Sequence, residues 1–136
     1  MKHISVYIRF LGLLLLIGCG TTKNQYPSSI AYGGEWVLQD TGEVQVDDRK
    51  IYISLDPSTS FFRGFGGCNK IQGNYLITGN SIDLFKITTT KKSCKEIKTE
   101  NTFISLLRKA DKVKITPSNF ELYKGSIILL IFKRER

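Results

Sequence analysis

Few residues of this sequence could act as a general base or a nucleophile near neutral pH. The 136 residues include one histidine, His3, and three cysteines, Cys19, Cys68 and Cys94. Because His3 falls in a segment that we predict to be removed on export, the mature chain would have no imidazole. That excludes Ser-His and Cys-His nucleophilic schemes and zinc sites that contain histidine, and we expect neither a metal nor a cofactor.

Carboxylates are the remaining candidates for acid–base chemistry, and they are scattered along the chain. A glycosidase would need two of them in one pocket, with the carboxyl groups about 5–10 Å apart. The adjacent pair Asp47-Asp48 falls in a predicted turn, where neighbouring side chains rarely converge on one bond. We therefore do not expect an enzyme, although a carboxylate pair assembled from distant strands stays a third alternative.

Residues 1–18 have the organisation of an export signal. A basic start precedes the apolar run 10–17, which is far shorter than the about 20 residues of a membrane-spanning helix. The run leads into the tetrapeptide LIGC at residues 16–19, which resembles the lipobox of bacterial lipoproteins. Such signals are cut before the cysteine, whose sulfur accepts a diacylglyceryl group, so the pattern predicts lipidation of Cys19. The alternative is an ordinary signal peptide that contains a chance cysteine.

The polar segment 19–31 is predicted to be a flexible tether between the lipid and a domain of residues 32–136. Fully extended, residues 20–31 could reach about 40 Å. Removal of residues 1–18, which contain two Lys or Arg residues and no acid, lowers the formal net charge from +8 to +6. Gly in place of Asp after the lipidated cysteine resembles an outer-membrane sorting signal. We therefore expect a lipoprotein of the bacterial cell envelope, in the outer membrane if the source has two membranes.

With Cys19 lipidated, Cys68 and Cys94 are the only thiols left. An exported chain meets an oxidising compartment, in which an even pair of cysteines most often forms a disulfide. Neither cysteine belongs to a C-x-x-C pair, which disfavours a redox or zinc site. A disulfide that closes the loop between residues 68 and 94 would stabilise the fold by about 3–4 kcal/mol.

The sequence GFGGCN at residues 64–69 contains three glycines in four positions. Glycine is favoured where φ is positive or where another segment comes very close to the backbone. We therefore predict a fixed corner after a strand, to which the segment around Cys94 is pinned. The side chain of Asn69 is expected to bond local backbone at this corner, with contact to a ligand as the alternative.

Alternation of apolar and polar residues with a period of two predicts short strands throughout the domain. Gly79-Asn80 is the signal of a two-residue hairpin turn, and Lys124-Gly125 predicts another turn. The last strand is continuously apolar, which is typical of a strand buried on both faces. The predicted strands cover residues 34–39, 44–46, 51–56, 60–65, 71–78, 82–87, 113–115, 120–122 and 127–132.

One amphipathic helix is predicted at residues 95–109, where apolar side chains recur at steps of three and four residues. Ser93 and Glu96 have the spacing of a capping box at its start. The order of elements, with one helix before the last three strands, indicates an α+β fold. The economical arrangement is a small antiparallel, curved or barrel-like sheet with the helix packed on it.

Several motifs follow one another in a fixed order between residues 34 and 133. They are Trp36-Val37-Leu38, the run FGGCN at 65–69 with Gly73-Asn74-Tyr75 after it, Thr89 and Cys94, Glu100 and Leu107 in the helix, and the closing apolar strands. This set resembles the META domain family, which includes the heat-shock-associated HslJ proteins. The resemblance implies a small antiparallel β structure with a helix, in the bacterial envelope, without catalytic residues to carry over.

Within this motif, Gly66, Gly67, Asn69, Gly73 and Tyr75 are interpreted as structural, with binding as the alternative. The chain departs from the family pattern just before the second cysteine. The family often has a methionine and a small residue there, whereas this chain has Lys92 and Ser93. If the family uses that segment as an apolar contact surface, this member lacks it.

We expect a lipid-anchored, non-catalytic envelope protein that supports envelope or stress tolerance through binding. The alternative is a binding or inhibitor module for a specific envelope protein. A basic surface favours anionic partners, and the export signal argues against nucleic acid. The basic cluster is expected to be ordinary solvated surface, with contact to anionic lipid or glycolipid as the alternative; it consists of Lys91, Lys92, Lys95 and Lys98.

Overall fold

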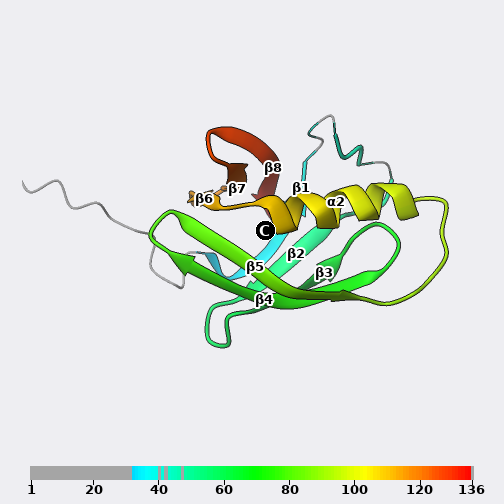
Figure 1. Ribbon diagram of the computed structural model, residues 1–136, viewed down its shortest axis with the longest axis horizontal. Coiled ribbons are helices and arrows are strands. Elements are labelled where there is room, and N and C mark those ends of the chain that lie inside the picture. The colour runs from blue at the N-terminus through cyan, green and yellow to red at the C-terminus, as the bar shows by residue number, and fades with distance from the viewer. Residues whose placement is uncertain (1–31, 40, 42, 47, 136) are drawn as a thin grey trace, which may run out of the picture.

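Eight antiparallel strands form a closed barrel in the computed structural model, which describes residues 32–39, 41, 43–46 and 48–135. Each strand pairs with its neighbours in chain order, and β8 pairs back to β1. One helix, α2, lies between β5 and β6 in sequence (Figure 1). The elements are β1 Gly34–Leu38, β2 Tyr52–Asp56, β3 Phe61–Phe65, β4 Lys70–Thr78, β5 Ser81–Thr89, α2 Ile97–Lys109, β6 Lys112–Ile115, β7 Asn119–Lys124 and β8 Ile127–Arg134. The predicted α+β class, a barrel-like sheet with a helix before the last three strands, is confirmed.

Alternate side chains of the strands point inward and fill the barrel. Trp36, Phe120 and Phe132 are completely buried, with ring centroids 5.6 Å apart for the first two and 5.7 Å for the last two. Phe103 of α2 reaches Phe132 at 6.2 Å, so the helix shares the core of the barrel. An eight-stranded barrel is just wide enough for side chains to fill it, and these aromatic rings do so.

The two predicted turns have the glycine where the hairpins need it. Gly79 has a φ of 62° and Gly125 a φ of 60°, each at the first position of a two-residue loop between paired strand ends. Turns of type II′ require a positive φ at that position, which glycine adopts without a steric penalty. The sequence signals therefore set the register of β4 against β5 and of β7 against β8.

The barrel is joined weakly between β5 and β6. Ser81 and Lys112 are their one paired position. Two flanking backbone hydrogen bonds support it, from Ile82 N to Asp111 O at 3.2 Å and from Val113 N to Asn80 O at 2.8 Å. Along the rest of β5, α2 packs beside the strand (Figure 1). The helix thus covers the edge of β5 that the short strand β6 leaves unpaired.

The predicted strand at residues 44–46 is wrong. Val44 is buried in the core, but the described residues of this segment form bends and irregular structure. β1 already has β2 on one side and β8 on the other. The segment therefore finds no open strand edge beside β1, and the apolar side chain of Val44 is buried from a loop.

The predicted start of the helix and its capping box are also wrong. α2 begins at Ile97, two residues later than expected, and Glu96 at its N-cap makes no side-chain capping bond. Ile97 N instead donates to Cys94 O at 3.4 Å, a turn that follows directly on the disulfide-bonded cysteine. The side chain of Glu96 lies 2.8 Å from Arg49 Nη1 and so does not reach back to Ser93.

Burial of β8 on both faces is wrong as well. Leu130 and Phe132 are fully buried, but Ile127 and Ile128 are 67% and 49% exposed. The helix packs on the inner side of β8 through Phe132, so it leaves the outer face of this strand uncovered. The continuous apolar run reflects an exposed apolar end of the strand and not a second covering layer.

Stability measurements on β8 can test this sidedness. Leu130→Ala should lower the free energy of unfolding by about 2–5 kcal/mol, because it opens a cavity in a filled core. Ile128→Ala should change it by less than about 1 kcal/mol, since half of that side chain is already in water. Denaturant titration of the two variants gives both values, and equal losses would mean that a layer covers the outer face after all.

Candidate functional site at the glycine corner

The glycine corner, residues 66–69, joins β3 to β4 in a tight turn. Gly66 N donates to Asn69 O at 3.0 Å. Gly67 has a φ of 101°, which residues other than glycine rarely adopt. Arg49 Nη1 donates to Gly67 O at 3.2 Å and also pairs with Glu96. The prediction of a positive φ or a close approach is confirmed here.

The carboxylate of Glu100 lies inside this corner. Its Oε2 accepts hydrogen bonds from the backbone N–H groups of Cys68, at 3.2 Å, and of Asn69. Its Oε1 accepts from Asn69 Nδ2 at 2.8 Å. Glu100 is only 2% exposed. Three hydrogen bonds from the protein therefore replace those with water that the carboxylate loses on burial.

Glu100 reaches the corner because it lies on the buried face of α2. It shares that face with Phe103, Ile104 and Leu107, at the three- and four-residue steps of a helix. Gly66 leaves the space for its side chain: a Cβ there would be 2.8 Å from Glu100 Cγ and 2.9 Å from Oε2. The glycine is therefore required by the carboxylate and not only by the turn.

Asn69 links the corner to the connection between β5 and α2. Its Oδ1 accepts from Lys92 N at 2.7 Å and from Thr90 Oγ1 at 2.8 Å. Its Nδ2 donates to Glu100 and, at 3.3 Å, to Lys92 O. Asn69 is 1% exposed, and both lone pairs and both amide hydrogens have protein partners. The prediction of a bond to local backbone is wrong, because the backbone partner of this side chain is Lys92, which lies 23 residues away in the sequence.

The predicted disulfide is confirmed between Cys68 and Cys94. The sulfur atoms are 2.03 Å apart and the Cα atoms 5.9 Å apart, within the usual range for a disulfide. The bridge ties the corner to the segment that enters α2. The same pair of segments is thus held twice, by the covalent bond and by the hydrogen bonds of Asn69.

Gly73 lies at an irregularity between β4 and β5. A Cβ at this position would be 2.8 Å from the ring of Phe62 and 2.9 Å from Phe85 O. The register shifts here, and Lys86 on β5 has a φ of 53°. Such a bulge bends the strand pair, which helps the sheet to close into a barrel.

Tyr75 is a core residue and not an exposed binding residue. It is 2% exposed, and its ring meets that of Tyr32 edge-on at 6.2 Å. Its hydroxyl has no hydrogen-bond partner among the described residues. Burial raises the pKa of Tyr75 well above its ordinary value, with smaller contributions from Tyr32 and Asp56, so the hydroxyl stays neutral.

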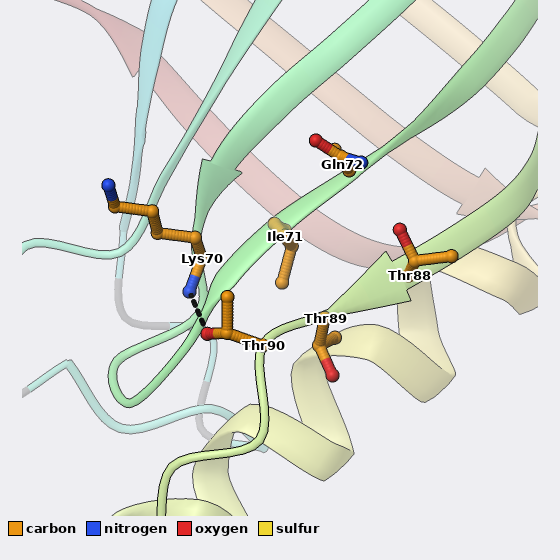
Figure 2. A pocket seen from close by; sticks show the side chains of 6 residues that line it. All are labelled: Lys70, Ile71, Gln72, Thr88, Thr89 and Thr90. Carbon is orange, nitrogen blue, oxygen red and sulfur yellow. Dashed lines mark hydrogen bonds between the residues drawn. The ribbon is translucent and has the colours of Figure 1, made fainter.

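Two shallow grooves adjoin the corner. One, of about 200 Å³, runs between β4 and β5 and is lined by Lys70, Ile71, Gln72, Thr88, Thr89 and Thr90 (Figure 2). Lys70 N donates to Thr90 Oγ1 at 3.2 Å across it (Figure 2). The other, of about 340 Å³, shares Thr89 and Thr90 and continues past the lysines at 91 and 92 to α2. Polar side chains predominate along these grooves, and the lining of the second includes Asn69 and Glu100, which are hydrogen-bonded to each other.

The predicted basic cluster is exposed around the start of α2. Lys91, Lys92, Lys95 and Lys98 all lie at the surface. Cys19, the predicted lipidation site, and the segments 1–18 and 19–31 lie outside the described residues. In the part of the chain that the structure describes, no cluster of acidic, histidine or cysteine side chains could hold a metal, and no helix is long and apolar enough to span a membrane.

Sequence reasoning named Glu100 only as a helix residue shared with a family, and it missed Arg49. The signal for Glu100 was present, since an acid among apolar residues on one helix face must find buried donors. No sequence signal pointed to Arg49, because its contacts with Gly67 and Glu96 depend on how a loop folds back over the corner.

Replacing Glu100 by Gln tests whether the corner depends on the carboxylate. The amide has one oxygen where Glu100 has two, so one donor of Asn69 or Cys68 would face an NH₂ group. We expect a loss of about 1.5–3 kcal/mol in the free energy of unfolding. Glu43→Gln, at an exposed carboxylate, is the control and should change it by no more than about 0.5 kcal/mol. If Glu100→Gln left the free energy of unfolding unchanged, the corner would not need the charge.

Replacing Tyr75 by Phe tests whether its hydroxyl is without a partner in the folded protein. Removing an unpaired buried hydroxyl should leave stability unchanged or raise it by up to about 1 kcal/mol. Tyr123→Phe is the comparison, since the Tyr123 hydroxyl donates to Glu121, and it should cost about 0.5–1.5 kcal/mol. Thermal and denaturant unfolding give both values. A loss above about 1 kcal/mol for Tyr75→Phe would reveal a bonded partner for the hydroxyl.

Three solved chains match this fold, and two of them illustrate the likeness. A protein from Burkholderia xenovorans, solved by NMR, has a TM-score of 0.61 with 18% identity, over 79% of this chain and 86% of its own. A DUF4847 family protein from Bacteroides vulgatus ATCC 8482, solved by crystallography, has a TM-score of 0.58 with 16% identity, over 78% of this chain and 95% of its own. At these identities the likeness extends to the fold alone.

A search among curated proteins finds no significant match. The model of the META domain matches residues 28–136, which include every strand and the helix. The corner with Cys68 and Asn69, the helix with Glu100 and the core position of Tyr75 all lie within that match. The chain therefore belongs to the META domain family.

Proposed function

We propose that this protein is a lipid-anchored, non-catalytic module of the bacterial cell envelope that supports envelope or stress tolerance through binding. Family membership supports a META-type domain in the mature chain. The LIGC tetrapeptide at residues 16–19 supports the anchor, because its cysteine is the acceptor that lipoprotein processing requires. Residues 20–31 then connect the lipid to the barrel.

The observation that carries this proposal is that the polar groups of the family motif form hydrogen bonds with other residues of the same chain. The side chain of Asn69 uses all its hydrogen-bonding capacity on Thr90, Lys92 and Glu100. The oxygens of Glu100 face donors of Cys68 and Asn69. A motif whose polar atoms are bonded within the protein stabilises the fold. A catalytic group would instead need a polar atom that is free to bond or exchange a proton with a substrate.

The pairing of two other acids, one at each end of α2, supports the same view. Glu96 pairs with Arg49, and Asp111 pairs with Lys124 at 3.0 Å. Hydrogen bonds that the Asp111 carboxylate accepts from Gly125 N and from Lys124 hold the pKa of Asp111 below its ordinary value, as expected for a carboxylate that stays ionised. A pair that shares a proton between two carboxyl groups would need the opposite environment.

A second candidate is a binding or inhibitor module for a specific envelope protein. Leu76 and Phe85 are 58% and 39% exposed on the outer face of the β4–β5 hairpin. Their registers with Asp83 and Asn74 place them diagonally across the strand pair, within reach of each other. A Leu76→Ser, Phe85→Ser double variant that loses one reproducible envelope partner, with the barrel intact, would favour this candidate.

Changing the lipid acceptor tests the anchor. Cys19→Ser should leave the chain unprocessed or release it from the membrane fraction, because no other side chain accepts the lipid. The wild-type protein extracted from membranes should have the mass of a chain that begins at Cys19 and carries lipid. Serine at another position of the same segment, Thr22→Ser, is the control and should leave both mass shift and membrane association unchanged. An unmodified Cys19 thiol, or retention of residues 1–18, would contradict the proposal.

A further inference from the structure

The segment from Leu84 to Ala110 concentrates positive charge on one part of the surface. It has seven Lys or Arg residues and two acids, Glu96 and Glu100; the cations are Lys86, Lys91, Lys92, Lys95, Lys98, Arg108 and Lys109. All seven are exposed. The segment comprises most of β5, the connection after it and α2.

Neither acid of this segment neutralises the exposed cations. Glu100 is buried in the glycine corner, where it faces backbone and amide donors. Glu96 lies 2.8 Å from Arg49, a cation from outside the segment. The packing that stabilises the corner therefore also removes negative charge from the outer side of α2.

The exposed cations of α2 lie on one face. The buried residues of the helix, Phe103, Ile104, Leu106 and Leu107 with Glu100, define the inner face. The exposed residues Lys98, Asn101, Arg108 and Lys109 lie opposite, within about a third of the helix circumference at 3.6 residues per turn. With Lys91, Lys92 and Lys95 before the helix, they form what we call the basic face.

The basic face opposes the local preference of the helix at one end. Cations are favoured near a helix C-terminus, where Arg108 and Lys109 lie, and disfavoured near the N-terminus. Lys95 and Lys98 nevertheless lie at the N-terminus, next to Lys91 and Lys92. Departures from local preference of this kind are expected where a surface meets a partner of opposite charge.

We propose that the basic face docks flat on an anionic lipid bilayer. This inference rests on the proposed lipid anchor at Cys19, because the anchor holds the domain beside the membrane. Extended residues 20–31 could reach about 40 Å, twice the about 20 Å length of a 13-residue helix such as α2. The tether therefore allows several faces to meet the bilayer, and charge decides among them.

The contact is electrostatic and not insertional. The basic face has no large apolar side chain, so it adsorbs at the headgroup level without entering the acyl region. Each Lys or Arg close to an anionic surface adds to the attraction, and the attraction decays within a Debye length. The docked state should therefore be lost as the salt concentration rises, while the anchored state persists.

Lysine footprinting of the lipidated mature protein tests this proposal. The protein is bound to vesicles of phosphatidylcholine alone or of phosphatidylcholine with phosphatidylglycerol, and lysine acetylation rates are read by mass spectrometry. On the anionic vesicles, Lys92, Lys98 and Lys109 should react about fivefold more slowly than on the neutral ones, and high salt should restore their rates. Lys114 and Lys133, which alternate with the buried Val113 and Phe132, are the internal controls and should not change.

A matched pair of variants separates docking from folding. Lys98→Glu with Lys109→Glu should abolish the protection of Lys92 on anionic vesicles, whereas Lys114→Glu with Lys133→Glu should leave it intact. Both variants should unfold like the wild type, since all four side chains are exposed. Flotation with uniform reactivity, or equal protection on neutral vesicles, would overturn the docking proposal and leave the anchor standing. Failure to float would overturn both.

Discussion

The structure depends on one buried carboxylate, that of Glu100. A charged group with almost no exposure would destabilise the fold strongly unless donors surrounded it, and the corner between β3 and β4 provides three. This requirement explains why several residue types occur together. Gly66 leaves space for the carboxylate, Gly67 turns the backbone so that consecutive N–H groups can point at it, and Asn69 adds a side-chain donor. The motif is therefore a receptor for a side chain of the same protein.

The same constraint positions the helix. α2 is held at its start by the Cys68–Cys94 bridge and the bonds of Asn69, one turn later by Glu100, and in its middle by Phe103 against Phe132. Covalent, polar and apolar contacts thus act in succession along the chain. Because Glu100 must face inward to be satisfied, the opposite face of α2 is left to Lys98, Arg108 and Lys109, and the charge of the surface follows from the chemistry of the core.

The sequence predicted most of the barrel because local rules govern it. Alternation placed the strands, glycine placed two hairpin turns, and the cysteine count paired Cys68 with Cys94. It failed where the outcome depends on which edges and faces are already occupied. Val44 became a buried loop residue because β1 has two neighbours, and β8 is covered on one side only. In the site, the glycines indicated a close approach, but the approaching group was visible only once the helix had been placed against them.

The weak junction of β5 with β6 gives the barrel an unequal resistance to opening. Seven of the eight strand interfaces have three or more paired positions, whereas this one has a single pair. The barrel can therefore be described as a curved sheet whose two edge strands, β5 and β6, meet at a single pair, with α2 packed beside β5 at this junction. Separation of β5 from β6 would leave all the other strand pairs intact, and the Cys68–Cys94 bridge would still hold the start of α2 to the corner. The protein therefore has a line along which its interior can be reached without dismantling the sheet.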